Sequence, residues 1–197
     1  MMQVKADTSD LERVFKESFE TMPDQAKRAF HRAAKETEKH AQMVIAKQVA
    51  SAYTIKAADV KNPKTARVSV TRSNGGLTLR YTGRPLTLHH FKYTPKAKSR
   101  RGSPRVRAAN KKTGLKSLGS HAFIGGTGAL NPGKVASIPF MREGKKHLPI
   151  KAVYGPSVPQ MIGNEEDVES VVIPDLNEYI FDRFKHHMDW YSKEGGK

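Results

Sequence analysis

The longest run of a single periodicity lies between residues 24 and 52, and it limits what this chain can fold into. From Asp24 to Ala52 no Gly or Pro occurs, and small or apolar residues recur every three or four positions. This spacing places them on one face of a helix. Pro23 suits the start of that helix, because its missing N–H is not needed in the first turn. We expect a helix of roughly 40 Å, at about 1.5 Å per residue, whose alanine-rich face lets a neighbour approach closely.

After Pro63 the period changes from helical to alternating. Apolar and polar residues alternate over 66–71 and again over 77–82, and the turn sequence Asn74-Gly75-Gly76 separates the two runs. This pattern predicts an antiparallel hairpin. Just before it, residues 57–60 are expected to form a short helical turn that Pro63 ends.

More strands are predicted downstream. Ala122-Phe123-Ile124 is interpreted as a buried strand, and residues 136–154 as a hairpin that stops at the turn Gly155-Pro156. Residues 86–92 also alternate. We expect them to be extended and to pair with Arg105-Val106-Arg107-Ala108, or with a partner chain.

Both ends of the chain are predicted to be helical. Residues 8–22 and 168–191 each carry an apolar stripe at helical spacing, and the second helix is expected to bend or start at Pro174. This order of elements indicates a single α+β domain over 1–197. We expect the long N-terminal helix to pack on a mostly antiparallel sheet of about four to six strands. The C-terminal helix would close the core, and an extended basic loop would leave the sheet. The parts are a helical region 1–59, a sheet region 60–155 and a helical region 156–197.

Positive charge is concentrated in the middle of the chain. The net charge is +16, and residues 60–142 hold 18 lysines and arginines without one Asp or Glu. Within them, residues 92–116 combine cations with Gly, Ser and Pro and have few bulky apolar side chains. We therefore expect a mobile basic hairpin or loop there. Its predicted partner-contacting cations are Lys96, Lys98, Arg100, Arg101, Arg105, Arg107, Lys111 and Lys112.

The basic segment 92–116 has more than one interpretation. A concentration of positive charge attracts an anionic partner, either nucleic acid or an acidic protein face. A solvated charged surface without a partner is the alternative. Aromatic residues that would stack on bases are confined to Phe91 and Tyr93 at its edge. Contact with phosphates or carboxylates is therefore favoured over the reading of bases.

No motif for catalysis, a cofactor or a metal stands out. The chain lacks Cys, which excludes disulfides and thiol chemistry. Residues 128–134 have the spacing of a phosphate-binding loop, but Val135 replaces the Ser or Thr that would ligate magnesium, so a flexible loop is the favoured interpretation. The eight His lack metal-site spacing, and the acidic run 165–167 suits a helix N-terminus. We predict a protein that is no enzyme and has no cofactor. A nuclease or ATPase is disfavoured, because the basic middle offers no carboxylate for magnesium.

The chain carries no predicted membrane segment. No run approaches the roughly 18 apolar residues that a membrane span needs. Residues 1–10 lack the apolar centre of a signal peptide. We expect a soluble protein without a membrane partner.

Short motifs between Tyr81 and Met161 carry a family resemblance. They are Gly83-Arg84-Pro85 with the following residues up to Phe91, Ala122-Phe123-Ile124, and residues 148–161. Together they resemble the prophage minor tail protein Z family of tailed bacteriophages. The resemblance marks these residues as family-motif or interface positions: Gly83, Arg84, Pro85, Phe91, Phe123, Pro149, Tyr154, Gly155 and Pro156. A strand-terminating, fold-specifying function of 154–157 is the competing interpretation.

The resemblance implies a structural protein of the virion. Such a protein is a minor tail or tail-completion protein, assembled in the host cytoplasm as a homo-oligomeric ring at the head-proximal end of the tail. Its partners would be the tail terminator or tail tube, with non-specific contact to genomic DNA through the basic segment. The glycine-rich stretch 125–139 is longer than the family pattern. A sequence-independent DNA-binding protein acting through residues 92–116 is the alternative.

Overall fold

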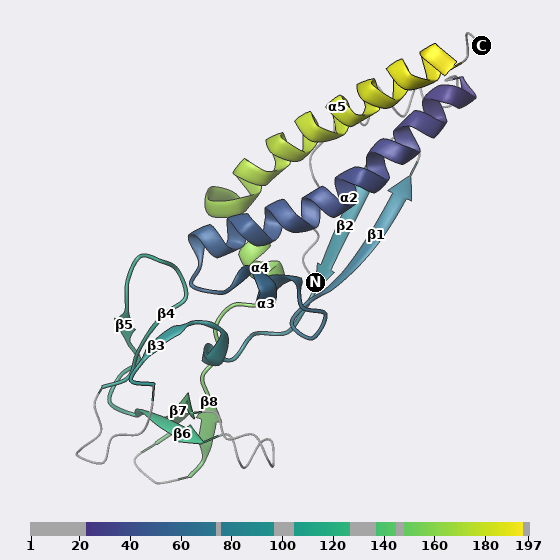
Figure 1. The fold of residues 1–197 in the computed structure, drawn as a ribbon. Coiled ribbons are helices and arrows are strands. Elements are labelled where there is room, and N and C mark those ends of the chain that lie inside the picture. Colours follow the sequence, from purple (N-terminus) through teal and green to yellow (C-terminus); the bar gives the residue numbers. More distant parts are fainter. Residues whose placement is uncertain (1–22, 74–75, 97–104, 127–136, 145–147, 195–197) are drawn as a thin grey trace.

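The computed structural model describes residues 23–73, 76–96, 105–126, 137–144 and 148–194 (Figure 1). A pair of long helices occupies one end of the molecule, and most of the strands gather at the other (Figure 1). The predicted helix 8–22 and the loop-like motif 128–134 lie outside the described residues. The predicted α+β class is confirmed.

The predicted long helix is confirmed as α2, Asp24–Ala52. It runs antiparallel to α5, Ser170–Glu194 (Figure 1). The buried side of α2 is rich in alanine, which lets α5 and the strands β1 and β2 lie close to its backbone. Towards the far end of the pair, Phe30 of α2 meets Phe184 of α5 edge to face, with their ring centroids 6.4 Å apart.

The strands of the described residues form three small antiparallel sheets, so the expectation of one sheet of four to six strands is wrong. The strands β3, β4 and β5 are only two or three residues long, and the 3-10 turn Leu88–His90 separates them from the first hairpin. That turn also corrects the prediction that residues 86–92 are extended throughout. The sheets are β1 (Arg67–Ser73) with β2 (Gly76–Thr82); β3 (Lys92–Thr94), β4 (Arg107–Ala109) and β5 (Lys116–Ser117); and β6 (Ala122–Gly126), β7 (Ser137–Arg142) and β8 (Ile150–Ala152).

The predicted local pairings are confirmed. Both hairpins form, β1 with β2 and β7 with β8, and β4 pairs with β3 as expected. The short helical turn is α3, Ala57–Lys61. The predicted C-terminal helix over 168–191 is confirmed as α5, which begins at Ser170 and not at Pro174. It follows a π-helical turn, Glu165–Glu169, and passes through Pro174, which lies inside the helix.

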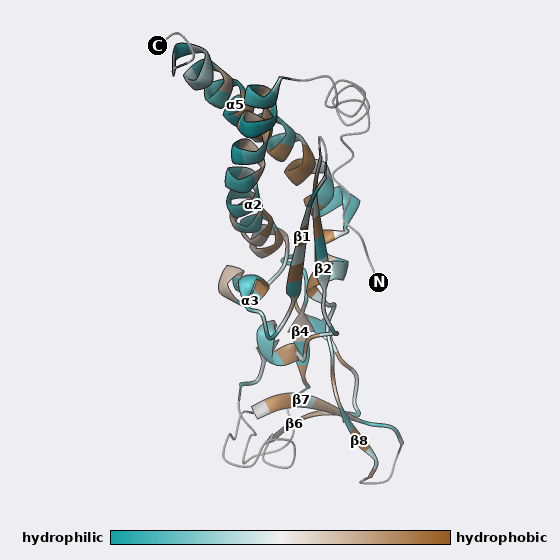
Figure 2. Cartoon of the chain, turned by 90° about the vertical axis from the view of Figure 1, so that its right-hand side faces the viewer, coloured by the Kyte–Doolittle hydropathy of each residue, from teal (hydrophilic) through white to brown (hydrophobic). Residues whose placement is uncertain are grey.

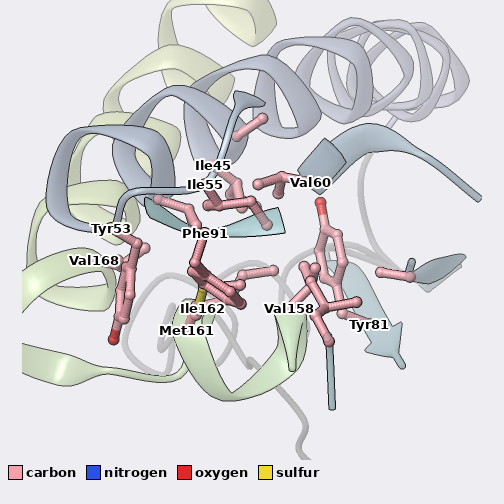
Figure 3. Close-up of a cluster of buried hydrophobic side chains, with 14 of the residues drawn as sticks. Ile45, Tyr53, Ile55, Val60, Tyr81, Phe91, Val158, Met161, Ile162 and Val168 are labelled. Carbon is pink, nitrogen blue, oxygen red and sulfur yellow. The ribbon is translucent and has the colours of Figure 1, made fainter. Parts of the chain in front are cut away.

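The main core lies at the junction where α2 meets the strands and the short helices. Side chains from α2, α3, β2 and the segment around α4 (Val158–Ile162) converge there (Figure 3). Buried residues from the N-terminal helix, the strand region and the C-terminal part of the described chain share this core. The side chains with almost no exposed surface include Val49, Leu88, Val106, Val158, Met161, Ile162 and Val168.

The helix α4 was not predicted, because residues 155–161 were interpreted as a turn built from Gly and two Pro. Ser157 is its N-cap: its hydroxyl accepts from the Gln160 N–H at 3.3 Å, and the Gln160 side chain accepts from the Ser157 N–H at 2.9 Å. This reciprocal pair is a capping box. The spacing of Ser157 and Gln160 was the available signal, since Pro159 is tolerated in a first helical turn.

Candidate interaction surface

The strands β3 and β4 place cations on one face and apolar side chains on the other. Tyr93 pairs with Ala108, and both are buried. Their neighbours Lys92 and Arg107 have the opposite parity and are exposed. Residues alternate across a strand, so these cations share the face opposite to Tyr93 and Ala108, which we call the outer face, together with Ala109, which is buried. Arg105 extends this outer face beyond the start of β4 and is also exposed.

The basic strands are anchored to the end of α2. The Lys92 N–H donates to the Thr54 hydroxyl at 3.0 Å, and that hydroxyl donates in turn to the Ala109 carbonyl. The Thr54 N–H donates to the Asn110 carbonyl at 2.8 Å, and the Lys112 N–H to the Ala52 carbonyl at 3.0 Å. The described residues 92–96 and 105–116 therefore contain the predicted hairpin, as the antiparallel pair β3 and β4, and backbone hydrogen bonds hold it against the segment that follows α2. Buried side chains such as Val106 supply the apolar contacts that the composition seemed to lack.

The predicted cations of this segment have different surroundings. Arg105, Arg107 and Lys112 are exposed and have no ion-pair partner among the described residues. Lys96 lies over the Tyr93 ring, 3.6 Å from its centroid, and desolvation lowers the pKa of its ammonium group. Lys98, Arg100 and Arg101 fall outside the described residues.

Lys111 is a structural residue more than a contact residue. Its ammonium nitrogen lies 2.5 Å from the Asp167 carboxylate, and this hydrogen bond raises the pKa of Lys111. The pair joins the basic strands to the π-helical turn at the start of α5. Lys111 therefore contributes little to the free positive charge of this surface, in contrast to its neighbour Lys112.

A second basic face was not singled out from the sequence. The outer face of the hairpin β1–β2 carries Arg67 and Arg80, because the register pairs Arg67 with Thr82 and Ser69 with Arg80. Both arginines are exposed. The alternating pattern over 66–71 and 77–82 was the signal that could have placed them together. The third arginine of this hairpin, Arg72, forms an ion pair with Glu38 of α2.

The two motif glycines lie where backbone segments approach closely. A Cβ atom on Gly83 would lie 2.7 Å from the Thr65 carbonyl oxygen, and one on Gly155 would lie 2.7 Å from Cε2 of Phe91. Phe91 is only 3% exposed. Three of the predicted family-motif positions are thus explained by packing.

The other motif positions lie at or near the surface. Arg84, Pro85 and Pro149 are exposed, and Pro156 is half-buried. Phe123 is half-buried and faces the guanidinium group of Arg142 at 4.3 Å from the ring centroid.

Tyr154 is the most informative of the exposed motif positions. It forms an isolated β-bridge with Thr87, yet 58% of its surface is exposed. Leu148 and Ile150, which lie near Tyr154 in the sequence, are exposed as well. Figure 2 shows hydrophobic segments in β7 at the end where most strands gather, whereas the visible far ends of α2 and α5 are mostly hydrophilic.

The titratable groups of the described residues form scattered pairs and no metal-binding cluster. No group of three or more His, Asp or Glu could hold a metal ion there. Three histidines each lie beside one carboxylate: His40 by Asp175 at 3.4 Å, His90 by Asp59 at 3.4 Å and His187 by Glu36 at 3.2 Å. No described helix has the length and apolar character to span a bilayer.

Comparison of the chain with family models, curated proteins and solved structures finds no match.

Proposed function

We propose that this chain is a structural virion protein of a tailed bacteriophage, a minor tail or tail-completion protein. It would assemble as a ring at the head-proximal end of the tail and take part in joining head and tail. The motifs between Tyr81 and Met161 are the origin of this proposal. Their glycines are consistent with it, because Gly83 and Gly155 stand at close approaches that this fold requires. Motif residues that permit such close approaches indicate a shared fold.

The observation that carries the proposal is the combination of exposed Tyr154 with free cations on one end of an elongated molecule. Tyrosine and arginine are enriched in protein–protein contacts, because they bring large area and several donors. Tyr154 is 58% exposed, and Arg105 and Arg107 have no described ion-pair partner. A protein that acts by shape and contact needs such a surface and no catalytic group.

The first test is the location of the protein. Mass spectrometry of tail complexes released from purified particles, with electron microscopy of labelled virions, should find a fixed number of copies at one end of the tail. Absence from particles would contradict the proposal.

A point variant then tests the surface. Tyr154→Ala should lower the yield of tail-joined heads in a complementation assay without lowering the melting temperature of the isolated protein, since the side chain is largely solvated. Met43→Ala on α2 is the matched control, because Met43 is 50% exposed and lies on a helix, outside the strands that carry the proposed surface. Phe91→Ala is unsuitable, since Phe91 is buried and its loss would unfold the chain.

Sequence-independent DNA binding is the second candidate, and the basic outer face of β3–β4–β5 favours it. Each neutralised phosphate contact contributes about 0.9 to the slope of log affinity against log salt. The double variant Arg105→Gln/Arg107→Gln should therefore lower that slope by up to about 2. Lys112→Gln should lower it further, and Lys111→Gln should change it little, because Lys111 is held by Asp167. Equal effects of Lys111→Gln and Lys112→Gln would contradict this candidate.

A further inference from the structure

The chain has an acidic segment in addition to its basic one. Residues 152–182 contain seven carboxylates and no Lys, Arg or His, whereas residues 60–142 contain 18 Lys and Arg and no carboxylate. The acidic segment covers the π-helical turn and the first half of α5. Charge of opposite sign is therefore separated into two segments of one chain.

Two carboxylates of α5, Glu178 and Asp182, lie on the side of the helix that faces away from the core, whereas Asp175 lies beside His40 of α2 at 3.4 Å. Val172 and Leu176 are buried in the core, and Arg183 and His187 face Glu36 of α2. Four exposed positions are spaced by three, four and seven residues, so they share the opposite side of the helix. They are Val171, Glu178, Phe181 and Asp182, which we define as the α5 outer face, and the exposed Lys185 continues this side of the helix beyond Asp182.

The α5 outer face combines exposed apolar side chains with carboxylates that have no ion-pair partner among the described residues. Val171 and Phe181 are 51% and 52% exposed. Glu178 and Asp182 have no ion-pair partner among the described residues. Exposed apolar side chains rimmed by charge are typical of protein–protein contact sites.

We propose that the α5 outer face of one copy docks on the basic outer face of β3–β4–β5 of a second copy. The two surfaces have opposite charge and belong to the same chain, so each copy supplies both halves of the contact. The Lys111–Asp167 pair is an instance, within one chain, of the attraction between these two segments. At a net charge of +16, copies repel one another unless an acidic face meets a basic one.

The proposed contact is head-to-tail. A two-fold symmetric dimer would instead make the contact twice, with the acidic face of each copy on the basic face of the other, and would stop at two copies. A head-to-tail contact leaves one free face at each end, so it builds a closed ring or an open filament. This is the subunit contact that the proposed ring needs. It is a property of the isolated chain, so it can fail while the virion location stands, and the reverse also holds.

The test uses the full chain, freed of nucleic acid, in sedimentation velocity at low and high salt. Wild type should form assemblies larger than a dimer at low salt and dissociate at high salt. Two variants each remove one face: Glu178→Gln/Asp182→Asn, and Arg105→Gln/Arg107→Gln. Each alone should stay monomeric. Their equimolar mixture should stop at a dimer, because only one intact acidic face and one intact basic face remain.

Charge reversal and a matched control complete the experiment. A chain with Glu178→Lys/Asp182→Lys and Arg105→Glu/Arg107→Glu should assemble again, since the complementary charges are exchanged. Lys35→Gln/Lys39→Gln, on exposed positions of α2, should assemble as wild type. The inference is overturned if wild type stays monomeric at low salt. The partner of the α5 outer face would then be a molecule other than a second copy of this chain. Assembly of the acidic-face variant alone would overturn the inference equally.

Discussion

The core junction beneath α2 and the basic strands β3–β4–β5 differ in what their side chains contact. At the junction, side chains such as Met161 and Leu88 are almost fully enclosed by other segments. In the basic strands, buried residues such as Tyr93 alternate with solvated cations. Substitutions at the junction therefore test folding, and substitutions on the outer face of the strands test contact. The sequence analysis grouped structural residues with contact residues. Phe91 and Lys111 were predicted as contact positions, but they hold the fold together.

The largest expected difference between the regions is that between two methionines. Met161 has no exposed surface, whereas Met141 of β7 is 36% exposed. Met161→Ala should lower the free energy of unfolding by about 2–5 kcal/mol, because it removes buried methylene groups and leaves a cavity. Met141→Ala should change it by less than about 0.5 kcal/mol. Chemical denaturation measures both, and equal losses would contradict the assignment of Met161 to the core.

The junction should also respond to alkaline pH through Tyr81. Burial raises the pKa of the Tyr81 hydroxyl from 10.0 to about 12. The folded state thus holds the proton more tightly than the unfolded state, so this stability is complete below pH 10 and is lost as the pH rises towards 12. The loss amounts to about 3 kcal/mol for a rise in pKa of about two units.

Tyr81→Phe separates this effect from the titration of lysines. The variant keeps the ring buried but has no ionisable hydroxyl. Its free energy of unfolding should fall less than that of wild type between pH 10 and pH 12. An identical fall in both proteins would show that Tyr81 is not the group responsible.

A glycine pair gives the next effect. Gly155→Ala should destabilise the protein by about 1–3 kcal/mol, because its Cβ would lie 2.7 Å from Cε2 of buried Phe91. Gly144→Ala is the control, since a Cβ there meets no atom within 4 Å. Thermal unfolding of both variants measures the contrast. Tolerance of alanine at 155 would mean that Phe91 can move, contrary to its enclosed position.

The smallest effect concerns the cap of α4. Ser157→Ala removes the hydroxyl that accepts from the Gln160 N–H and should cost about 1 kcal/mol. Ser120→Ala, at an exposed position, should be neutral within about 0.5 kcal/mol. Denaturant titration compares the two, and a neutral Ser157→Ala would show that α4 is held by packing alone.

Local patterns predicted most of the local structure. The stripe over 24–52 predicted α2, and the alternation over 66–71 and 77–82 predicted the first hairpin. The outer cations Arg105 and Arg107 were also identified, because charge runs are visible in the sequence. The helix α4 was missed although its capping pair Ser157 and Gln160 was present, since two prolines favoured a turn.

Partners distant in the sequence were beyond prediction. The pairing of Lys111 with Asp167 joins residues that no periodicity relates, and it removes Lys111 from the free charges. The close approach of Gly155 to Phe91 is likewise visible only once both segments are in place. The division of the strands among three sheets follows from the same cause, because strand partners are chosen by packing between segments.

The sequence by itself determined the lengths of the main helices and hairpins, the separation of positive and negative charge, and the lack of cysteine chemistry. These properties are local or compositional, so they do not depend on how the segments meet. The tertiary structure alone decided which cations remain free, which motif residues are buried and which face of α5 is exposed. Burial and ion pairing are relations between segments, and they are fixed only when the core of Val49, Leu88 and Met161 closes.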